Sequence, residues 1–279
     1  MRVVKFNNLK IGLDQALTII AGPCIIENEK MILETASHLI SAVKNRPVQL
    51  IFKSSYKKAN RTSLSGFAGI NFLKALEIIE KVKMESDLPV LADVHSEMEI
   101  PVVAEVVDVL QIPAFLCRQT ELLLAAGRSG KLVNIKKGQF LFPGDMEKAA
   151  EKISSTGNNN IMFTERGTTF GYHNLVVDMR GLVMMSKTGY PVIFDATHSV
   201  QLPGGEGSAS GGQPEYILPL AKAALATGAV SGIFMEVHPD PSKALSDAKS
   251  QLPLHDFSKV LDQLLKIFET SQDIRKEFG

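Results

Sequence analysis

The stretch Leu17-Thr-Ile-Ile-Ala-Gly-Pro-Cys24 decides between the two folds that this chain's pattern permits. Its first five residues, Leu17–Ala21, are apolar or β-branched without alternation, which predicts a strand buried on both faces in a parallel sheet. In a doubly wound open sheet the first strand runs into a G-x-G-x-x-G turn. Here the strand runs into Gly22-Pro23-Cys24 instead. The stretch therefore favours a closed parallel barrel.

Seven further runs of the same kind follow this first one. They are Val48–Phe52, Pro89–Ala92, Val107–Ile112, Leu132–Ile135, Ile161–Phe163, Val192–Phe194 and Gly232–Met235. Amphipathic stretches with the helical period separate them. These predict helices over Lys30–Lys44, Phe72–Lys83, the segment from the N-cap Asp145 to Gly157, Pro214–Thr227 and Phe257–Phe268.

Eight strand–helix units in about 250 residues are typical of a (β/α)₈ barrel. We predict an α/β fold in which residues 1–279 form one (β/α)₈ TIM-barrel catalytic domain. Met1–Gln15 precedes the first strand and is predicted to be a short N-terminal extension, a hairpin that caps the barrel floor.

Composition narrows the function classes. Lys+Arg and Asp+Glu number 30 each, and this zero net charge argues against nucleic-acid and membrane partners. Two cysteines cannot build a disulfide framework, and the sequence has neither a signal peptide nor an apolar run long enough for a membrane span. We expect a soluble, cytoplasmic protein.

Polar residues follow every predicted strand, at the end where (β/α)₈ barrels carry their active sites. Five of them are cations: Lys53, Lys58, Arg61, Lys136 and Arg166. In a neutral protein, five cations at one barrel mouth need anions, and phosphate groups with a carboxylate fit them. A single lysine at a strand end is usually a solvated or ion-paired charge, but five cations after three different strands favour a binding site.

Four metal-capable side chains share this face: Cys24, His198, Glu236 and Asp247. A thiolate, an imidazole and two carboxylates suit one divalent transition metal, namely zinc, iron(II) or manganese, better than magnesium. Each residue alone has a simpler interpretation, since a buried cysteine is usually inert packing. Cys117 is interpreted as such a packed thiol. No organic cofactor is predicted.

Longer motifs carry a family resemblance. Lys53-Ser-Ser-Tyr-Lys-Lys-Ala-Asn-Arg-Thr-Ser63 resembles the K-x-x-x-x-K-A-N-R-S-S stretch of the 3-deoxy-D-manno-octulosonate 8-phosphate synthase family. Similar matches occur at Gln111–Thr120, Asn134–Phe140, Thr164–Gly167, Phe170–Asp178, Phe194–Gly205 and Glu236–Pro241.

The resemblance implies a transferase of lipopolysaccharide biosynthesis. Such enzymes condense phosphoenolpyruvate with D-arabinose 5-phosphate and water, and release inorganic phosphate with the eight-carbon product. It also implies a homotetramer, in which the segment Phe115–Arg118 contacts a neighbouring subunit's site. The family has a metal-independent class with Asn in place of Cys24, so this chain resembles the metal-dependent class.

The resemblance also implies residue roles. The expected phosphoenolpyruvate ligands are Lys53, Lys58, Gln111, Lys136 and Arg166, and the expected arabinose 5-phosphate ligands are Asn60, Arg61 and Thr62. Arg118 is expected to be a further substrate-binding residue. The expected catalytic residues are Lys58, Asn60, Asp93, His95 and Lys136. Three positions depart from the family pattern: Thr62 replaces Ser and keeps the hydroxyl, Lys57 replaces an acidic residue, and His173 stands where Asn or Asp is usual.

Two alternatives remain at this point. The first is 3-deoxy-D-arabino-heptulosonate 7-phosphate synthase, which uses erythrose 4-phosphate and typically has K-P-R-T-S where Ala59-Asn60 lengthens the turn here. The second, from another class, is a non-catalytic phosphosugar-binding barrel, which would bind phosphate tightly without releasing it from phosphoenolpyruvate.

Overall fold

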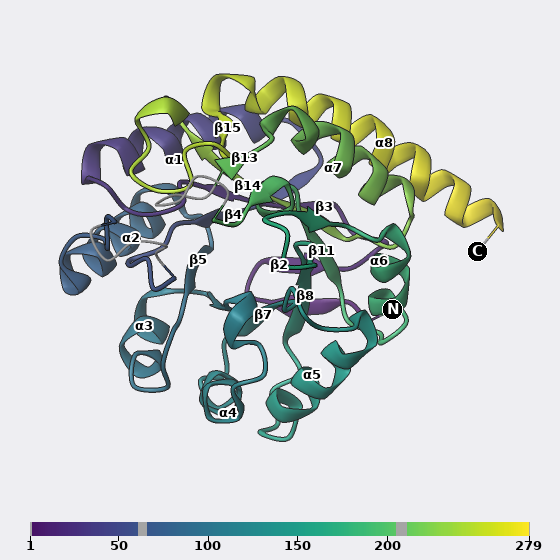
Figure 1. Cartoon of the computed structure of the whole chain (residues 1–279), viewed down its shortest axis with the longest axis horizontal. Coiled ribbons are helices and arrows are strands. Elements are labelled where there is room, and N and C mark those ends of the chain that lie inside the picture. Colours follow the sequence, from purple (N-terminus) through teal and green to yellow (C-terminus); the bar gives the residue numbers. More distant parts are fainter. Residues whose placement is uncertain (1, 61–65, 205–210, 279) are drawn as a thin grey trace.

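The computed structural model describes residues 2–60, 66–204 and 211–278. Within them, eight parallel strands pair in chain order, and the last pairs with the first, so the sheet closes into the predicted (β/α)₈ barrel. Figure 1 shows these strands at the centre of a ring of helices. The barrel strands are β3 (Leu17–Gly22), β4 (Val48–Lys53), β5 (Val90–Asp93), β6 (Val109–Ile112), β7 (Leu132–Lys136), β8 (Ile161–Glu165), β11 (Val192–Asp195) and β14 (Gly232–His238).

The helices cover the outer face of the sheet with their apolar sides. They are α1 (Glu29–Val43), α2 (Phe72–Ser86), α3 (Ile100–Val106), α4 (Thr120–Arg128), α5 (Met146–Ser154), α6 (Met179–Ser186), α7 (Ile217–Ala226) and α8 (Phe257–Phe278). The five predicted helices are present, although α8 continues ten residues past the predicted end and extends beyond the barrel wall (Figure 1).

Helix caps explain part of the boundaries. Asn28 accepts a 3.0 Å hydrogen bond from the backbone of Met31 and so caps α1. Asp145, the predicted cap of α5, occupies the cap position but makes no side-chain capping bond, because a short 3₁₀ turn, Pro143–Asp145, leads directly into the helix.

The N-terminal extension is a hairpin, as predicted. Its strands β1 (Val4–Phe6) and β2 (Leu9–Ile11) pair antiparallel and bury Val4, Leu9 and Ile11 in the barrel floor. These three contact one inward-facing side chain from each barrel strand: Ile20, Ile51, Leu91, Val109, Leu132, Met162, Ile193 and Phe234. The lower half of the barrel is therefore a solid hydrophobic plug, and an interior cavity has room only at the opposite end.

Short extra strands elaborate that opposite end. β9 (Thr168–Thr169) pairs with β10 (Leu175–Val176) after β8, and β12 (Gln201–Leu202) pairs with β13 (Gly211–Gly212) after β11. β15 (Leu252–Pro253) extends the pairing of β14. Among the described residues, no helix is both long and apolar enough to cross a bilayer.

Candidate active site

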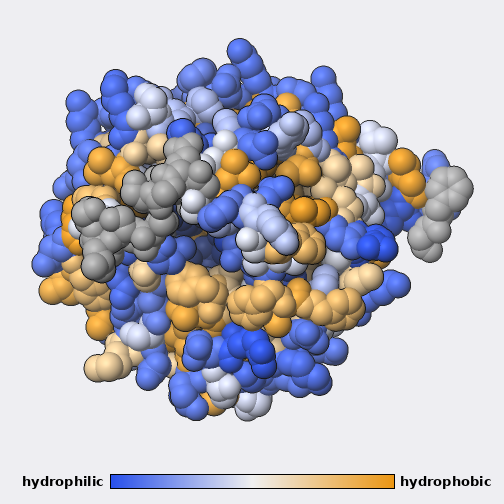
Figure 2. Space-filling view, in the orientation of Figure 1, coloured by the Kyte–Doolittle hydropathy of each residue, from blue (hydrophilic) through white to orange (hydrophobic). Residues whose placement is uncertain are grey.

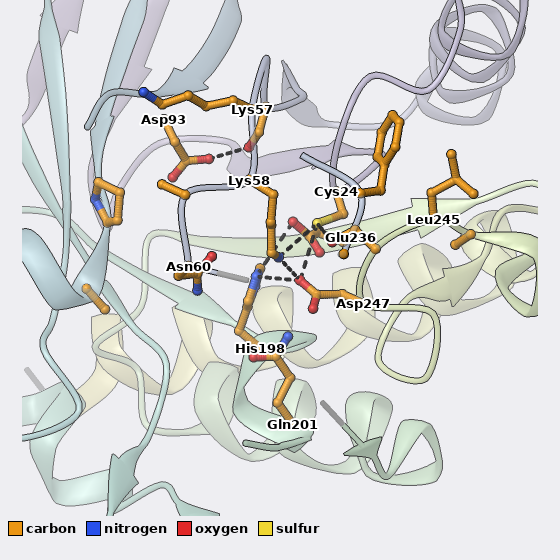
Figure 3. A pocket seen from close by; sticks show the side chains of 18 of the residues that line it. Cys24, Lys57, Lys58, Asn60, Asp93, His198, Gln201, Glu236, Leu245 and Asp247 are labelled. Carbon is orange, nitrogen blue, oxygen red and sulfur yellow. Dashed lines mark hydrogen bonds and ion pairs between the residues drawn. The ribbon is translucent and has the colours of Figure 1, made fainter. Parts of the chain in front are cut away.

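A cavity of about 310 Å³ opens at the carboxyl ends of the barrel strands (Figure 3). Its volume lies at the lower end of the usual range for small-molecule sites, about 300–1,000 Å³. Most of the residues predicted from the sequence line it together. Those lining residues are Cys24, Lys53, Lys58, Asn60, Asp93, His95, Lys136, Arg166, His198, Glu236 and Asp247.

Two predicted site residues do not line the cavity, and two others lie outside the described residues. Gln111 is fully buried beneath the cavity and does not line it. Arg118 is exposed and lines a separate small cavity beside Cys117. Arg61 and Thr62 lie outside the described residues.

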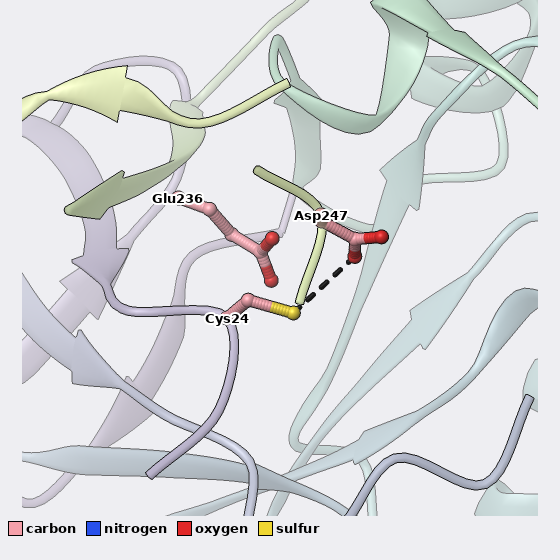
Figure 4. Close-up of side chains that lie close together, drawn as sticks. All are labelled: Cys24, Glu236 and Asp247. Carbon is pink, nitrogen blue, oxygen red and sulfur yellow. Dashed lines mark hydrogen bonds between the residues drawn. The ribbon is translucent and has the colours of Figure 1, made fainter. Parts of the chain in front are cut away.

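One corner of the cavity brings three metal-capable groups together. The Cys24 sulfur and one carboxylate oxygen each of Glu236 and Asp247 all lie within 4.8 Å of one another (Figure 4). Gly22 permits the approach of Cys24, because a Cβ there would overlap the carbonyl oxygen of Lys53 and its φ is +156°. Asp247 itself has φ +50°, a left-handed conformation that is unusual for a residue with a side chain.

His198, the fourth predicted ligand, stands at the edge of this group. Its Nε2 lies 3.6 Å from Glu236 Oε1 and 3.9 Å from Asp247 Oδ2. Its Nδ1 lies 2.7 Å from Asp195 Oδ2, at the end of β11. A carboxylate behind one ring nitrogen, with the other nitrogen facing the ligands, is the arrangement that orients histidine toward a metal.

Two lysines neutralise this corner in the structure. Lys53 Nζ lies 2.5 Å from Glu236 Oε1, and Lys58 Nζ donates to Asp247 and lies 3.4 Å from the Cys24 sulfur (Figure 3). Burial alone would lower the pKa of each lysine, but the facing carboxylates hold both above the ordinary value. The corner therefore holds permanent positive charge beside its two carboxylates.

The same environment keeps the Cys24 thiol protonated in the absence of a metal. Burial, and then the charges of Asp247 and Glu236, raise its pKa. The thiol donates to Asp247 Oδ2 at 3.2 Å. A soft divalent cation would replace this proton, so the donor set of sulfur and carboxylate oxygen fits a transition metal.

A second wall of the cavity is built around Asp93. Its Oδ2 accepts from Ser55 at 2.6 Å and lies 3.9 Å from Lys53, while its Oδ1 accepts from Gln111 at 2.8 Å. Burial alone would raise the pKa of Asp93, but Lys53 and Lys136 hold it below the usual range, so the group is a carboxylate. Nearby, burial lowers the pKa of His95, whose Nδ1 is buried without a hydrogen-bond partner in the described part of the chain.

Lys136 and Arg166 complete the cationic lining. Lys136 Nζ lies 2.7 Å from Asp195 Oδ2 and 4.3 Å from the ring centre of Phe234. Arg166 donates to the backbone oxygen of His198 at 3.1 Å and to Gln201 at 2.7 Å, and both acceptors are neutral. The buried Nε of Arg166 has no partner among the described residues. This guanidinium is thus available to an anion.

Some site residues were missed by the sequence analysis. Glu99 accepts from Tyr56 at 2.7 Å, from the backbone of His95 at 3.1 Å, and from Lys57, so it ties the segment after β4 to the segment after β5. Gln201 links Arg166 to Ser250. No local pattern marks either residue, because most of their partners are distant in sequence.

Comparison with known proteins agrees with this geometry. The sequence profile of the DAHP synthetase I family matches residues 2–273, and the chain belongs to that family. Within it, the chain is 54% identical over 267 residues to a protein of Geotalea uraniireducens (strain Rf4) named 2-dehydro-3-deoxyphosphooctonate aldolase, covering 96% of this chain and 98% of that one. Proteins of the same name from Syntrophotalea carbinolica and Geobacter sulfurreducens are each 52% identical, and each alignment covers at least 95% of both chains.

Proposed function

We propose that this protein condenses phosphoenolpyruvate with D-arabinose 5-phosphate and water to 3-deoxy-D-manno-octulosonate 8-phosphate and inorganic phosphate. The observation that carries the proposal is the convergence of Lys53, Lys58, Lys136 and Arg166 on one cavity, in a chain whose relatives bear the name of an octonate phosphate aldolase. Those names refer to the eight-carbon product, so the seven-carbon alternative is not favoured.

The charges of the cavity support two anionic substrates. The lysines are already compensated, since Lys53, Lys58 and Lys136 each face a carboxylate. Among the described residues, the side chain of Arg166 has only neutral acceptors, and its buried Nε has no hydrogen-bond partner. We assign Arg166 to the phosphate or carboxylate of phosphoenolpyruvate, because its planar fork binds either group through paired hydrogen bonds.

The reaction needs positioning more than acid strength. The C3 carbon of phosphoenolpyruvate is a weak nucleophile that must meet the sugar aldehyde in line. Its attack forms the new C–C bond, water adds at C2, and phosphate leaves by C–O cleavage. Lys136, fixed between Asp195 and Phe234, supplies a charge beside the reacting carbons without forming a Schiff base. Asp93 and His95 are assigned to water positioning and proton transfer.

We further propose that Cys24, His198, Glu236 and Asp247 hold one divalent transition metal in each subunit. The close approach of three of these ligand atoms, and the support of His198 by Asp195, favour it. Zinc, iron(II) and manganese all accept such ligands. A bound metal would supply orientation and polarisation for the aldehyde or the water.

A phosphate-release assay tests the function. We expect the purified protein to release phosphate from phosphoenolpyruvate with arabinose 5-phosphate and at least about tenfold more slowly with erythrose 4-phosphate. Metal analysis before and after chelation accompanies the assay. Faster turnover of erythrose 4-phosphate, or tight phosphate binding without release, would overturn the proposal. Activity unchanged after complete metal removal would overturn the metal assignment.

Self-association into a homotetramer is proposed as well. Exposed aromatic side chains follow β6, β7 and β8, and Figure 2 shows hydrophobic side chains gathered where Figure 1 places β7 and β8. The exposed aromatic side chains after these three strands are Phe115, Phe140, Phe142, Phe170 and Tyr172. Arg118 is exposed and does not line the cavity of its own subunit, so we propose that it reaches the cavity of a neighbouring subunit. Light scattering on the eluting protein distinguishes a tetramer from a monomer. We place the reaction in the cytoplasm, which cell fractionation tests.

A further inference from the structure

A row of buried hydrogen bonds crosses four neighbouring barrel strands directly beneath the cavity. Thr164 Oγ1 on β8 donates to Asn134 Oδ1 on β7, Asn134 Nδ2 donates to Gln111 Oε1 on β6, and Gln111 Nε2 donates to Asp93 Oδ1 on β5. All three distances are 2.8 Å. Thr164, Asn134 and Gln111 are fully shielded from solvent. The row ends at the one member that lines the cavity, Asp93.

The row lies between two layers of inward-facing side chains, the hydrophobic plug below and the cavity lining above. Two residues below each member lies an inward-facing side chain of the hydrophobic plug: Leu91, Val109, Leu132 and Met162. Two residues above each member lies a residue of the cavity lining: His95, Pro113, Lys136 and Arg166. Since side chains two apart share a face of a strand, the row is the floor of the cavity.

Hydrophobic residues would fill this floor at lower cost. The layer below is packed with Leu, Val and Met, and burying amide groups is unfavourable unless every one is paired. A polar row here is therefore poorly explained by packing alone. Its members are satisfied only as a set, so each fixes the orientation of the next.

The carboxylate of Asp93 at the end of the row determines which group donates and which accepts in each hydrogen bond. A carboxylate only accepts hydrogen bonds, so Gln111 must turn its amino group toward Asp93 and its oxygen toward Asn134. Asn134 must then turn its oxygen toward Thr164, whose hydroxyl rotates to donate. Oδ1 of Asp93 is thereby held by Gln111, and Oδ2 is left for Ser55 and for the cavity.

We propose that Asn134 and Thr164 are positioning residues for this reaction, because they fix the Gln111 amide that orients the Asp93 carboxylate in the cavity. The inference rests on the proposed function, since Asp93 is assigned there to water positioning and proton transfer. Neither residue lines the cavity. Their side chains connect to the cavity through Gln111 and Asp93.

The test compares Thr164→Val with Thr164→Ser in the metal-loaded enzyme. Val keeps the shape and removes the hydroxyl, whereas Ser keeps the hydroxyl. We expect Thr164→Val to lower kcat about tenfold with KM for both substrates within about twofold, and Thr164→Ser to restore kcat to within about twofold of the parent. Asn134→Leu interrupts the row one step nearer to Asp93 and is expected to lower kcat further.

Thr18→Val is the matched control. Thr18 is likewise fully buried on a barrel strand, but its hydroxyl has no hydrogen-bond partner among the described residues, so kcat should not change. Melting temperatures show which variants are folded. Unchanged kcat in folded Thr164→Val or Asn134→Leu, or equal losses in Thr164→Val and Thr164→Ser, would overturn the inference. An inactive parent enzyme would instead overturn the proposed function.

Discussion

On one side of the cavity, Cys24, Glu236 and Asp247 converge from two strand ends and a loop, and lysines balance their charge. In the second wall, Asp93 lies 3.9 Å from Lys53, and one of its oxygens also accepts from Gln111, whose amide is held by neutral hydrogen bonds from the next two strands. The corner that holds Cys24, Glu236 and Asp247, called the metal corner below, is thus balanced by ion pairs. In the Asp93 wall, ion pairing is joined by a row of neutral hydrogen bonds whose spacing follows the register of the strands. The comparison indicates that the two walls should respond differently to substitution and to conditions.

The largest expected effect concerns charge balance in the metal corner. Lys53→Met leaves the buried Glu236 carboxylate without its 2.5 Å partner, which should lower the free energy of unfolding by about 3–5 kcal/mol without metal. Added zinc should recover part of this loss, because it restores positive charge beside Glu236. Urea unfolding with and without zinc measures both effects.

A matched control uses an exposed pair of the same kind. Lys74 pairs with Glu77 at 3.2 Å, with both side chains more than half exposed, so Lys74→Met should cost less than about 1 kcal/mol. If Lys53→Met lowered the free energy of unfolding no more than Lys74→Met, or if zinc recovered none of the loss, ion pairing would not be what stabilises this corner.

The next effect separates metal binding from catalysis. Cys24→Asn should weaken metal affinity at least about a hundredfold, since even indirect partners of a metal site are worth about 10–100-fold. Because the metal-independent class carries Asn at this position, we expect the variant to remain active in chelator. Isothermal titration and the phosphate-release assay measure the two quantities.

Cys117→Ala is the control for that substitution. Cys117 is also buried but lies away from the cavity, so metal affinity should stay unchanged. An inactive Cys24→Asn enzyme that still bound its metal would count against an orienting role for the metal.

The Asp93 wall is probed through pH. Because the folded pKa of Asp93 lies below its unfolded value of about 3.9, its charge stabilises the fold above that pH, and the stabilisation is lost as pH falls toward the folded pKa. The difference in unfolding free energy between the parent and Asp93→Asn should therefore be largest near pH 7 and shrink below about pH 4. Urea titrations at pH 7, 5 and 3.5 measure it, and a difference that does not change with pH would contradict the assigned charge.

The contrast between the walls also explains what the sequence could and could not predict. The strand positions could be predicted because each barrel strand contains a run of mostly apolar residues, and the residues just past these runs lie at one end of the barrel. Gln111 was expected in the cavity, but its strand ends one residue later, which leaves the side chain in the layer below. Asn134 lies inside the predicted run Leu132–Ile135 and Thr164 directly follows the run Ile161–Phe163, and only the three-dimensional register pairs their side chains. Asp145 has the right residue type for a cap, but the preceding turn removes the need for one.

The smallest expected effect concerns Lys57, at the solvent-exposed rim of the cavity. Lys57 pairs with Glu99 while its side chain is 38% exposed, so solvent screens the pair. Lys57→Met should change the free energy of unfolding by less than about 1 kcal/mol. It should also raise KM for the sugar phosphate about twofold at low salt, because a cation is removed from the cavity mouth. Steady-state kinetics at low and high salt measure this, and the difference should vanish at high salt. A loss of stability comparable to that of Lys53→Met would mean that Glu99 depends on Lys57 as strongly as Glu236 depends on Lys53, and the distinction between rim and interior would fail.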